Sequence, residues 1–460
     1  MSTPDRAADS TVALDAAPAD GEASPPAPAS GAATPTDGAV RDAAWLKYAA
    51  LTIGAFAIAI AIRAWIVSQR GLGLVEDLDL FLRWTRGLTE RGLSGFYQPG
   101  VFCDYPPLML LLFRGVGAAA TAWAGGEVSG HSLTVGIKSL ACAGDLLIGA
   151  LLLIEGRRLL GPRGGLFACA AYLLNPVALY DSAYWGQMDS IYTAGVLAAL
   201  TLVGRRRCLG AGAAAGAALA AKFQSIAILP LVVFEAFRLA GWRGLRNLLA
   251  GAVLALAAVA TPFLATGTLR EVVDRAYVHV VGQYHEMSKN AFNIWHLLDD
   301  PTAPDVAPPL ALTRLVAGGR DRVQVEESWL LQLTWRRISL AIFALVVAVV
   351  LSIYAWRAGP VARFGAAGLL ALCFFLFPTE MHERYAYPAV ALLAIWAAAR
   401  PANERVYWIF TLLLTLNLTA VLPVKPLSPQ IAVAMLGVFG VLLMSLGSSR
   451  REAQPADDAP

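Results

Sequence analysis

The feature that most constrains this chain is a succession of about a dozen apolar runs, most of them long enough to cross a lipid bilayer. The runs cover residues 44–67, 133–155, 164–184, 188–203, 208–221, 223–240, 247–266, 337–357, 363–379, 385–399, 405–421 and 431–447. Only 15% of the 460 residues are charged, against about a quarter in an ordinary soluble domain. We therefore expect an all-α polytopic membrane protein. This composition excludes a soluble enzyme, a disordered scaffold and a nucleic-acid-binding protein.

The two ends of the chain differ in composition from the apolar part. Residues 1–42 are rich in Ala, Pro, Ser, Asp and Gly and contain almost no large apolar side chains, and residues 450–460 are similar. Such segments bury too little apolar surface to offset the entropy lost on ordering. The sequence therefore predicts two disordered tails around one membrane domain at residues 43–449.

Short basic loops between the runs predict how the chain is oriented, because such loops stay on the cytoplasmic side. The arginines concerned are Arg157, Arg158, Arg163, Arg205, Arg206, Arg207, Arg238, Arg243, Arg246, Arg357, Arg363, Arg400, Arg405, Arg450 and Arg451. With these loops inside, both termini are cytoplasmic. Two long segments, residues 68–106 and 267–336, are then extracytoplasmic loops.

Residues 107–124 form an apolar stretch that does not fit this alternation. A crossing there would place Arg157 and Arg158 on the outer side. We therefore expect a non-spanning or half-membrane helix, and the rival interpretation is one further crossing nearby. The Ala- and Gly-rich run 209–221 is expected to be a close packing face, because small residues let helices approach in lipid.

The first outer loop begins with three carboxylates, Glu76, Asp77 and Asp79. They form either a solvated acidic turn, an Asp-x-Asp pair that shares a divalent cation, or a site with one general base near a bound hydroxyl. The same loop ends with Asp104 and Tyr105, followed by two prolines that fix the direction of the next segment.

Polar side chains also occur at two short outer corners, where little chain is available to carry them away from the bilayer. Trp185, Gln187 and Asp189 lie at one corner and Lys222 at another. Polar groups at such depth tend to line a cavity within the protein. Lys222 either extends to the interface or points into an outer cavity to meet a phosphate.

Two further groups extend this set of candidate binding residues. His382, Glu383 and Arg384 lie in a corner with more titratable residues than an ordinary turn contains. Asn290, Asn293 and Trp295, in the long outer loop, combine amides with aromatic side chains in a pattern that suits a sugar. Together these residues predict a site for a lipid-phosphate-linked sugar on the outer side.

Five motifs together resemble a known family. They are Asp77…Trp84, Asp104-Tyr105-Pro106-Pro107, Tyr184-Trp185-Gly186-Gln187-Met188-Asp189-Ser190, Asn290-Ala291-Phe292-Asn293-Ile294-Trp295 and Met381-His382-Glu383-Arg384-Tyr385. This combination is similar to the bacterial mannosyltransferases related to the second mannosyltransferase of GPI-anchor synthesis, which belong to the GT-C superfamily. More distantly, it resembles the dolichol-linked glucosyltransferases of N-glycan assembly.

The resemblance implies a GT-C membrane fold and an inverting, metal-independent glycosyltransferase without a cofactor. The implied partners are a polyprenyl-phosphate-linked sugar, with mannose as the expected sugar, and a lipid-linked or glycan acceptor outside the cell membrane. By position in the motif, Asp77 matches the family's general base, and Asp79 is the second choice. Phosphate partners are expected among Lys222, His382 and Arg384.

A polytopic transporter or lipid flippase is the alternative function. Asp145 and Lys138 lie within an apolar run, and a continuous polar path through them would favour transport. The polar groups instead gather at the outer edge, and the chain shows no repeated halves of the kind common in transporters. The sequence leaves the acceptor open.

Overall fold

The computed structural model describes residues 37–279, 282–298, 300–309, 333–419 and 427–448. Residues 37–42 of the predicted N-terminal tail are helical, so the helix begins earlier than expected. The rest of both tails lies outside the described residues, and its disorder stays a prediction. The chain divides into two units, Met1–Lys47 and Tyr48–Pro460. Of the first unit the structure describes only residues 37–47, which are helical. All that follows concerns the second unit.

The described chain is almost entirely helical. The α-helices are α1 (Asp37–Ser68), α2 (Val75–Arg91), α3 (Pro107–Ala124), α4 (Gly130–Leu173), α5 (Pro176–Ala178), α6 (Asp189–Gly204), α7 (Cys208–Ala221), α8 (Leu229–Ala265), α9 (Leu269–Val273), α12 (Trp335–Arg357), α13 (Ala362–Leu376), α14 (Tyr387–Ala398), α15 (Pro401–Leu418) and α16 (Ser428–Ser448). The π-helical segments η1 (Leu179–Trp185) and η3 (Asp274–Val278) and the 3-10 turns η2 (Phe223–Ala227) and η4 (Ile294–Leu297) connect them. Two short strands, β1 (Ser288–Lys289) and β2 (Met381–His382), pair in parallel.

The predicted apolar runs coincide with these helices, and two long helices each contain two runs. α4 breaks at Gly161, where φ is +77°, and α8 breaks at Gly241, where φ is +57°. Glycine adopts such angles without steric cost. Gly156 packs against Gly165 across the first break, so the two limbs of α4 run side by side in opposite directions.

Among the described helices, six are long and apolar enough to cross a membrane, and α6, α7, α13 and α14 are shorter apolar helices. α14 is buried on all sides, whereas α8 and α12 leave many apolar side chains exposed. Apolar surface exposed along a helix is expected where the helix faces lipid. These features confirm the all-α polytopic membrane fold expected from the sequence. Gly212 and Gly216 of α7 also pack closely on α8, as the run 209–221 predicts.

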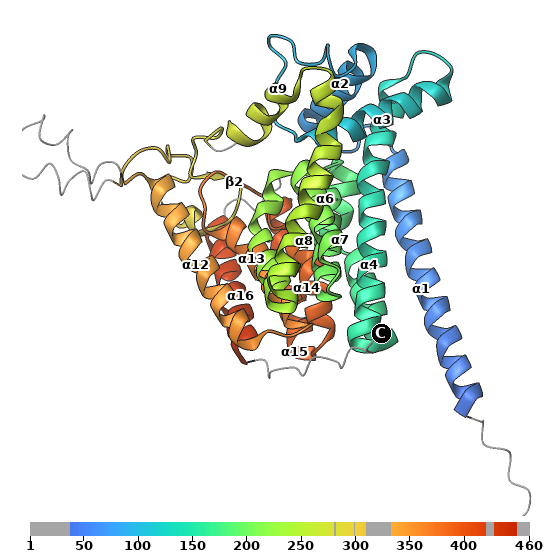
Figure 1. Cartoon of the computed structure of the whole chain (residues 1–460), viewed down its shortest axis with the longest axis vertical. Helices are drawn as coiled ribbons and strands as arrows, with labels where there is room; N and C mark the ends of the chain where they lie inside the picture. Colours follow the sequence, from blue (N-terminus) through green and yellow to red (C-terminus); the bar gives the residue numbers. More distant parts are fainter. Residues whose placement is uncertain (1–36, 280–281, 299, 310–332, 420–426, 449–460) are drawn as a thin grey trace, which may run out of the picture. The chain divides into compact units, whose positions relative to one another are not determined.

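The segment at residues 68–106, which the sequence predicts to be an outer loop, contains a helix that the apolar runs did not predict. α2 buries Leu78, Phe81, Trp84 and Leu88 along one face only, so its average composition is too polar to stand out. Figure 1 shows α2, α3 and α9 at one end of the bundle, with α3 lying across the end of α4. α3 is itself one of the six helices long and apolar enough to cross a membrane, so the non-spanning helix expected at residues 107–124 stays a prediction.

At the opposite ends of the spanning limbs, two buried glutamates each contact two arginines. Glu155 accepts hydrogen bonds from Arg158 at 2.6 and 3.1 Å and from Arg205 at 2.8 Å. The side chain of Glu155 is fully buried. Two arginines that the sequence assigns to cytoplasmic loops are therefore also ion-pair partners inside the fold.

Glu235 repeats this arrangement on the neighbouring helices. It accepts from Arg238 at 2.5 and 3.0 Å and from Arg363 at 2.7 Å. Gly204 leaves room for the Arg363 guanidinium, which brings the two glutamate clusters close together. In both clusters, each of the two carboxylate oxygens of the glutamate is hydrogen-bonded.

Candidate active site

Asp77 lies in the first turn of α2 and is held by two side chains from a distant part of the chain. Trp185 Nε1 and Gln187 Nε2 both donate to Asp77 Oδ2, each at 2.8 Å. Because both bonds end on Oδ2, the lone pairs of Oδ1 are left for another partner. The arrangement fixes the carboxylate and keeps one oxygen for chemistry.

The local fold explains why Trp185 and Gln187 reach the same oxygen. Trp185 ends the π-helical segment η1, and Gly186 follows with φ +84°, a left-handed conformation that glycine adopts easily. The Tyr105 hydroxyl contacts Gln187 Oε1 at 3.4 Å, which orients the amide so that its nitrogen faces Asp77. π-helical segments occur frequently at functional sites.

Tyr105 is itself positioned by the aromatic packing of α2 on α3. Its ring lies 5.5 Å from Phe81 and 5.2 Å from Trp84, measured between ring centroids. The Trp84 indole donates to the carbonyl of Phe102 at 2.6 Å, just before Asp104 and Tyr105. These contacts hold the end of the segment at residues 68–106 against α2.

Asp79 occupies a different environment from Asp77. Residues two apart on an α-helix point about 200° away from each other, and Asp79 is exposed whereas Asp77 is half-buried. The structure therefore brings Asp77, and not Asp79, together with Trp185 and Gln187.

Asp189, Lys222 and Arg384 form a second cluster, drawn from three separate outer corners. Lys222 Nζ lies 2.6 Å from Asp189 Oδ1, and Arg384 Nε lies 3.7 Å from Asp189 Oδ2. Asp189 Oδ2 and Arg384 Nε are both buried without a hydrogen-bond partner among the described residues. The Arg384 guanidinium also lies 5.3 Å from the ring of Trp185, which joins this cluster to the one around Asp77.

A cavity of about 320 Å³ opens beside these residues. Its polar lining consists of Asp104, Tyr105, Lys222, Gln224, Tyr284, Arg336, Thr379, Glu380, Arg384 and Tyr385, and its apolar lining of Pro106, Phe223, Ile226, Leu340, Phe343, Phe374, Pro378 and Met381. Ile226 and Leu340 are 41% and 46% exposed. They lie on η2 and α12, so the cavity reaches the outer surface of the bundle between these elements.

The titratable groups near this cavity differ in their charge preferences. Burial raises the pKa of Asp104, although Arg384 and Lys222 nearby oppose that change. Burial and the cations Arg384, Lys222 and Lys289 lower the pKa of His382 well below its usual value. His382 is therefore a neutral imidazole near pH 7, and the cations that line the cavity are Lys222, Arg336 and Arg384.

Glu383 is paired with Arg384 and is not among the residues that line the cavity. Its Oε1 accepts from Arg384 Nη1 at 3.1 Å, and burial raises the pKa of its carboxyl group. His382 lies between the rings of Tyr284 and Tyr385, at 4.8 and 5.1 Å between centroids. Both residues support the corner that carries Arg384.

Asn290, Asn293 and Trp295 lie outside the residues that line this cavity. Asn293 Nδ2 donates to the Phe375 carbonyl at 3.2 Å, and Trp295 Nε1 donates to the Phe377 and Pro378 carbonyls at 3.0 Å. The Asn290 carbonyl accepts from Asn417 at 3.0 Å. These bonds anchor the outer segment to the end of α13 and to α15.

Several cavity residues were missed by sequence reasoning. Arg336 reads in the sequence as the basic flank of a membrane span, and Tyr284 reads as one aromatic residue in a long loop. Gln224 alone had a signal, since it is a polar residue within an apolar run. Among the described residues, no three His, Cys, Asp or Glu side chains group as metal ligands.

No family model matches the sequence, and no curated protein matches it. The structure is similar to that of ArnT from Cupriavidus metallidurans in the apo state, with a TM-score of 0.51 and 16% identity over 88% of this chain and 77% of that one. The same protein bound to undecaprenyl phosphate gives a TM-score of 0.50 and 15% identity over 86% and 76% of the two chains. The described chain therefore shares its fold with ArnT, and this fold is the all-α polytopic membrane fold that the sequence predicts.

Proposed function

We propose that the chain is a membrane-embedded inverting glycosyltransferase that moves a sugar from a polyprenyl-phosphate donor to an extracytoplasmic acceptor. The observation that carries this proposal is the pairing of a cation-lined, half-apolar cavity with a held carboxylate beside it. Tyr105 and Arg384 line the cavity and also contact the side chains that hold Asp77. Mannose is the proposed sugar, on the basis of the motif resemblance.

The cavity suits a lipid phosphate in both of its halves. Phe223, Ile226, Leu340 and Phe343 offer apolar surface to a polyprenyl chain, which would leave the cavity between η2 and α12. Lys222 offers a charge to the phosphate at the polar end. ArnT, which has a similar fold, is known bound to undecaprenyl phosphate.

In the proposed reaction, the acceptor hydroxyl attacks the anomeric carbon of the donor sugar. Asp77 Oδ1 takes the hydroxyl proton as the new carbon–oxygen bond forms, and the bond from the anomeric carbon to the phosphate oxygen breaks. The bond pair leaves with the polyprenyl phosphate, and Asp77 then releases the proton to water. Attack and departure on opposite faces of the sugar give inversion.

The leaving phosphate gains one negative charge during this step. Lys222 and Arg384 are already held in place by Asp189, so they can meet that charge with little reorganisation. Preorganised charges of this kind are often the largest single contribution to catalysis. Arg384 Nε has no hydrogen-bond partner among the described residues, so its N–H can donate to the phosphate.

The transporter alternative is not favoured by the surroundings of Asp145 and Lys138. Asp145 contacts Arg63 at 2.9 Å and accepts from Tyr172 and Tyr387, each at 2.7 Å. Lys138 Nζ donates to the Leu72 carbonyl at 2.6 Å. The two residues thus belong to separate hydrogen-bonded networks and not to a continuous polar path.

The test is transfer by the purified full-length chain in proteoliposomes supplied with synthetic polyprenyl-phosphate-mannose and a panel of lipid-linked and glycan acceptors. We expect D77N to lower the rate by about 100-fold or more, as for loss of a general base, with an unchanged thermal transition. E76Q, an exposed neighbour, is the matched control. A large loss in D79N instead would assign the base to Asp79, and full activity in folded D77N would refute the mechanism.

A further inference from the structure

The outer segment that precedes α12 is attached to the corner that carries Arg384. Ser288 and Lys289 of β1 pair with Met381 and His382 of β2. Two residues of strand pairing are too few to fix a segment by themselves. Further contacts must therefore determine how this corner is placed.

Glu380, directly before β2, has an unusual backbone conformation. Its φ is +65°, a region that residues other than glycine adopt rarely and at some cost. Its backbone N–H donates to the carbonyls of Glu286 and Met287, both at 3.2 Å. Such a conformation persists only where the surroundings determine it from several directions.

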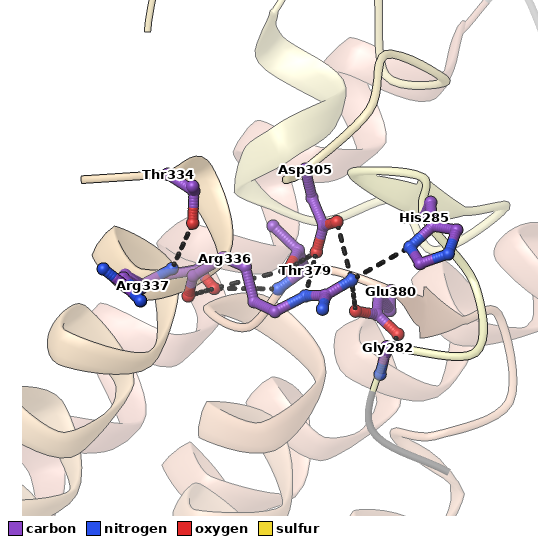
Figure 2. Close-up of polar contacts among 9 residues, drawn as sticks. Gly282, His285, Asp305, Thr334, Arg336, Arg337, Thr379 and Glu380 are labelled. Atoms are coloured by element: carbon purple, nitrogen blue, oxygen red, sulfur yellow. Dashed lines mark hydrogen bonds and ion pairs between the residues drawn. The ribbon is translucent and has the colours of Figure 1, made fainter. Parts of the chain in front are cut away.

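Arg336, in the first turn of α12, helps to hold Glu380 in this conformation through the contacts that Figure 2 shows. Its Nε and Nη2 donate to the two oxygens of Asp305 at 3.0 and 2.9 Å. The same Nη2 lies 2.7 Å from Glu380 Oε1, and Glu380 Oε2 accepts from the Gly282 N–H at 3.0 Å. The planar guanidinium therefore joins two carboxylates from two different segments.

Asp305 extends this network to the other side of Glu380. Thr379 Oγ1 donates to Asp305 Oδ2 at 2.7 Å, and the backbone N–H of Arg336 donates to the Asp305 carbonyl at 2.9 Å. Thr379, Glu380 and α12 are thus held together just before Met381. We call the three side chains of Arg336, Asp305 and Glu380 the outer brace.

We propose that Arg336 is a positioning residue, which through the outer brace sets where residues 381–384 lie and so where Arg384 meets the donor phosphate. This inference rests on the proposed function. Arg336 and Glu380 line the same cavity as Lys222 and Arg384, so a shift in the brace moves a wall of the donor site. Lysine would not replace Arg336, because it lacks the fork that contacts two carboxylates at once.

The test uses R336Q, E380A and E380Q in the full-length chain, with R270Q as the matched control. Arg270 is an exposed outer arginine whose ion pair with Asp274 spans 3.6 Å. We expect the donor KM to rise about tenfold in R336Q and E380A. In E380Q, whose amide oxygen still accepts from Arg336, we expect a rise of about threefold. A merely structural role would lower the amount of folded enzyme, and hence the maximal rate, without changing KM.

Hydrogen exchange provides a readout that does not depend on transfer. In R336Q we expect faster exchange at the amides of residues 380–387, where Tyr385 donates to the His382 carbonyl and Tyr387 to that of Arg384. Unchanged exchange there would overturn the brace, whatever the enzyme transfers. Faster exchange with an unchanged donor KM would overturn the positioning role. If the wild-type chain transfers no sugar, the proposed function fails while the exchange result still tests the brace.

Discussion

The two ends of the helical bundle hold charged clusters of similar composition, which differ in the hydrogen bonding of their carboxylates and in whether a cavity adjoins them. At the end assigned to the cytoplasm, both oxygens of Glu155 and of Glu235 are hydrogen-bonded by arginines. At the outer end, Asp189 faces Lys222 and Arg384, yet one of its oxygens lacks a hydrogen bond among the described residues and a cavity adjoins the cations.

The difference separates charges that hold the fold from charges that can act on a ligand. A buried carboxylate whose lone pairs are satisfied has little left to offer a substrate, and removing it leaves two arginines uncompensated. A cation that lines a cavity can bind a phosphate while its carboxylate partner holds it in place. At the inner end, Arg205 Nε and Arg363 Nη1 also lack a hydrogen-bond partner among the described residues, but neither arginine lines the cavity. The adjoining cavity, and not burial, ion pairing or an unsatisfied nitrogen alone, therefore distinguishes the candidate site.

The largest expected effect comes from a change in the Glu235 cluster. E235Q should lower the free energy of unfolding by about 3–5 kcal/mol, because it leaves the buried Arg363 and the partly buried Arg238 beside a neutral side chain. The Tm in detergent should fall, while transfer per folded molecule stays at the wild-type level. E127Q, which removes an exposed carboxylate, is the control. A Tm equal to that of the wild type would refute the structural role of this cluster.

The corresponding change at the outer end should affect catalysis instead. R384Q removes a charge that meets the leaving phosphate in the proposed reaction, and we expect kcat to fall by about 100- to 1,000-fold. The Tm should change less than in E235Q. Transfer assays and thermal unfolding on the same preparation measure both. If R384Q lost stability and kept its turnover, the two ends would have the same role.

A smaller effect is expected for the second outer cation. K222Q should weaken binding of undecaprenyl phosphate about tenfold, which corresponds to about 1.4 kcal/mol. Titration of the lipid phosphate against the purified chain measures this. K289Q is the control, since Lys289 pairs with Glu286 at the surface and does not line the cavity. Equal losses in both variants would indicate a general effect of positive charge.

The smallest effect concerns pH and the outer brace. Burial raises the pKa of Glu380 to about 7, with Asp305 adding to the increase and Arg336 opposing it. The folded chain therefore holds this proton more tightly than the unfolded chain does. Its contribution to stability is present below the ordinary carboxyl pKa and is lost as the pH rises through about 7.

We therefore expect the Tm to decline between about pH 4.5 and 7 partly through Glu380, and E380Q to flatten that decline. His285 contacts Arg336 at 3.3 Å, so H285Q serves as a second control. Thermal unfolding across this pH range provides the measurement. An identical slope in wild type and E380Q would exclude Glu380 as the source.

Much of the fold was predictable because its determinants are local. An apolar run long enough to cross a bilayer forms a helix wherever it lies in the chain, and the described part of each predicted run is mostly helical. α2 escaped prediction because only one of its faces is apolar. The candidate residues at the outer corners were predictable by type, since polar groups between membrane spans are costly and generally functional.

The sequence by itself determined the membrane-spanning helices and a short set of polar residues at their outer ends. Only the tertiary structure decided what each residue does. Asp77 differs from Asp79 because Trp185 and Gln187, more than a hundred residues away, donate to one and not to the other. Asn293 and Trp295 serve as anchors, and Arg336 becomes part of the cavity, for the same reason. Residues far apart in the chain become hydrogen-bond partners only when the helices pack, so no local sequence pattern predicts these pairs.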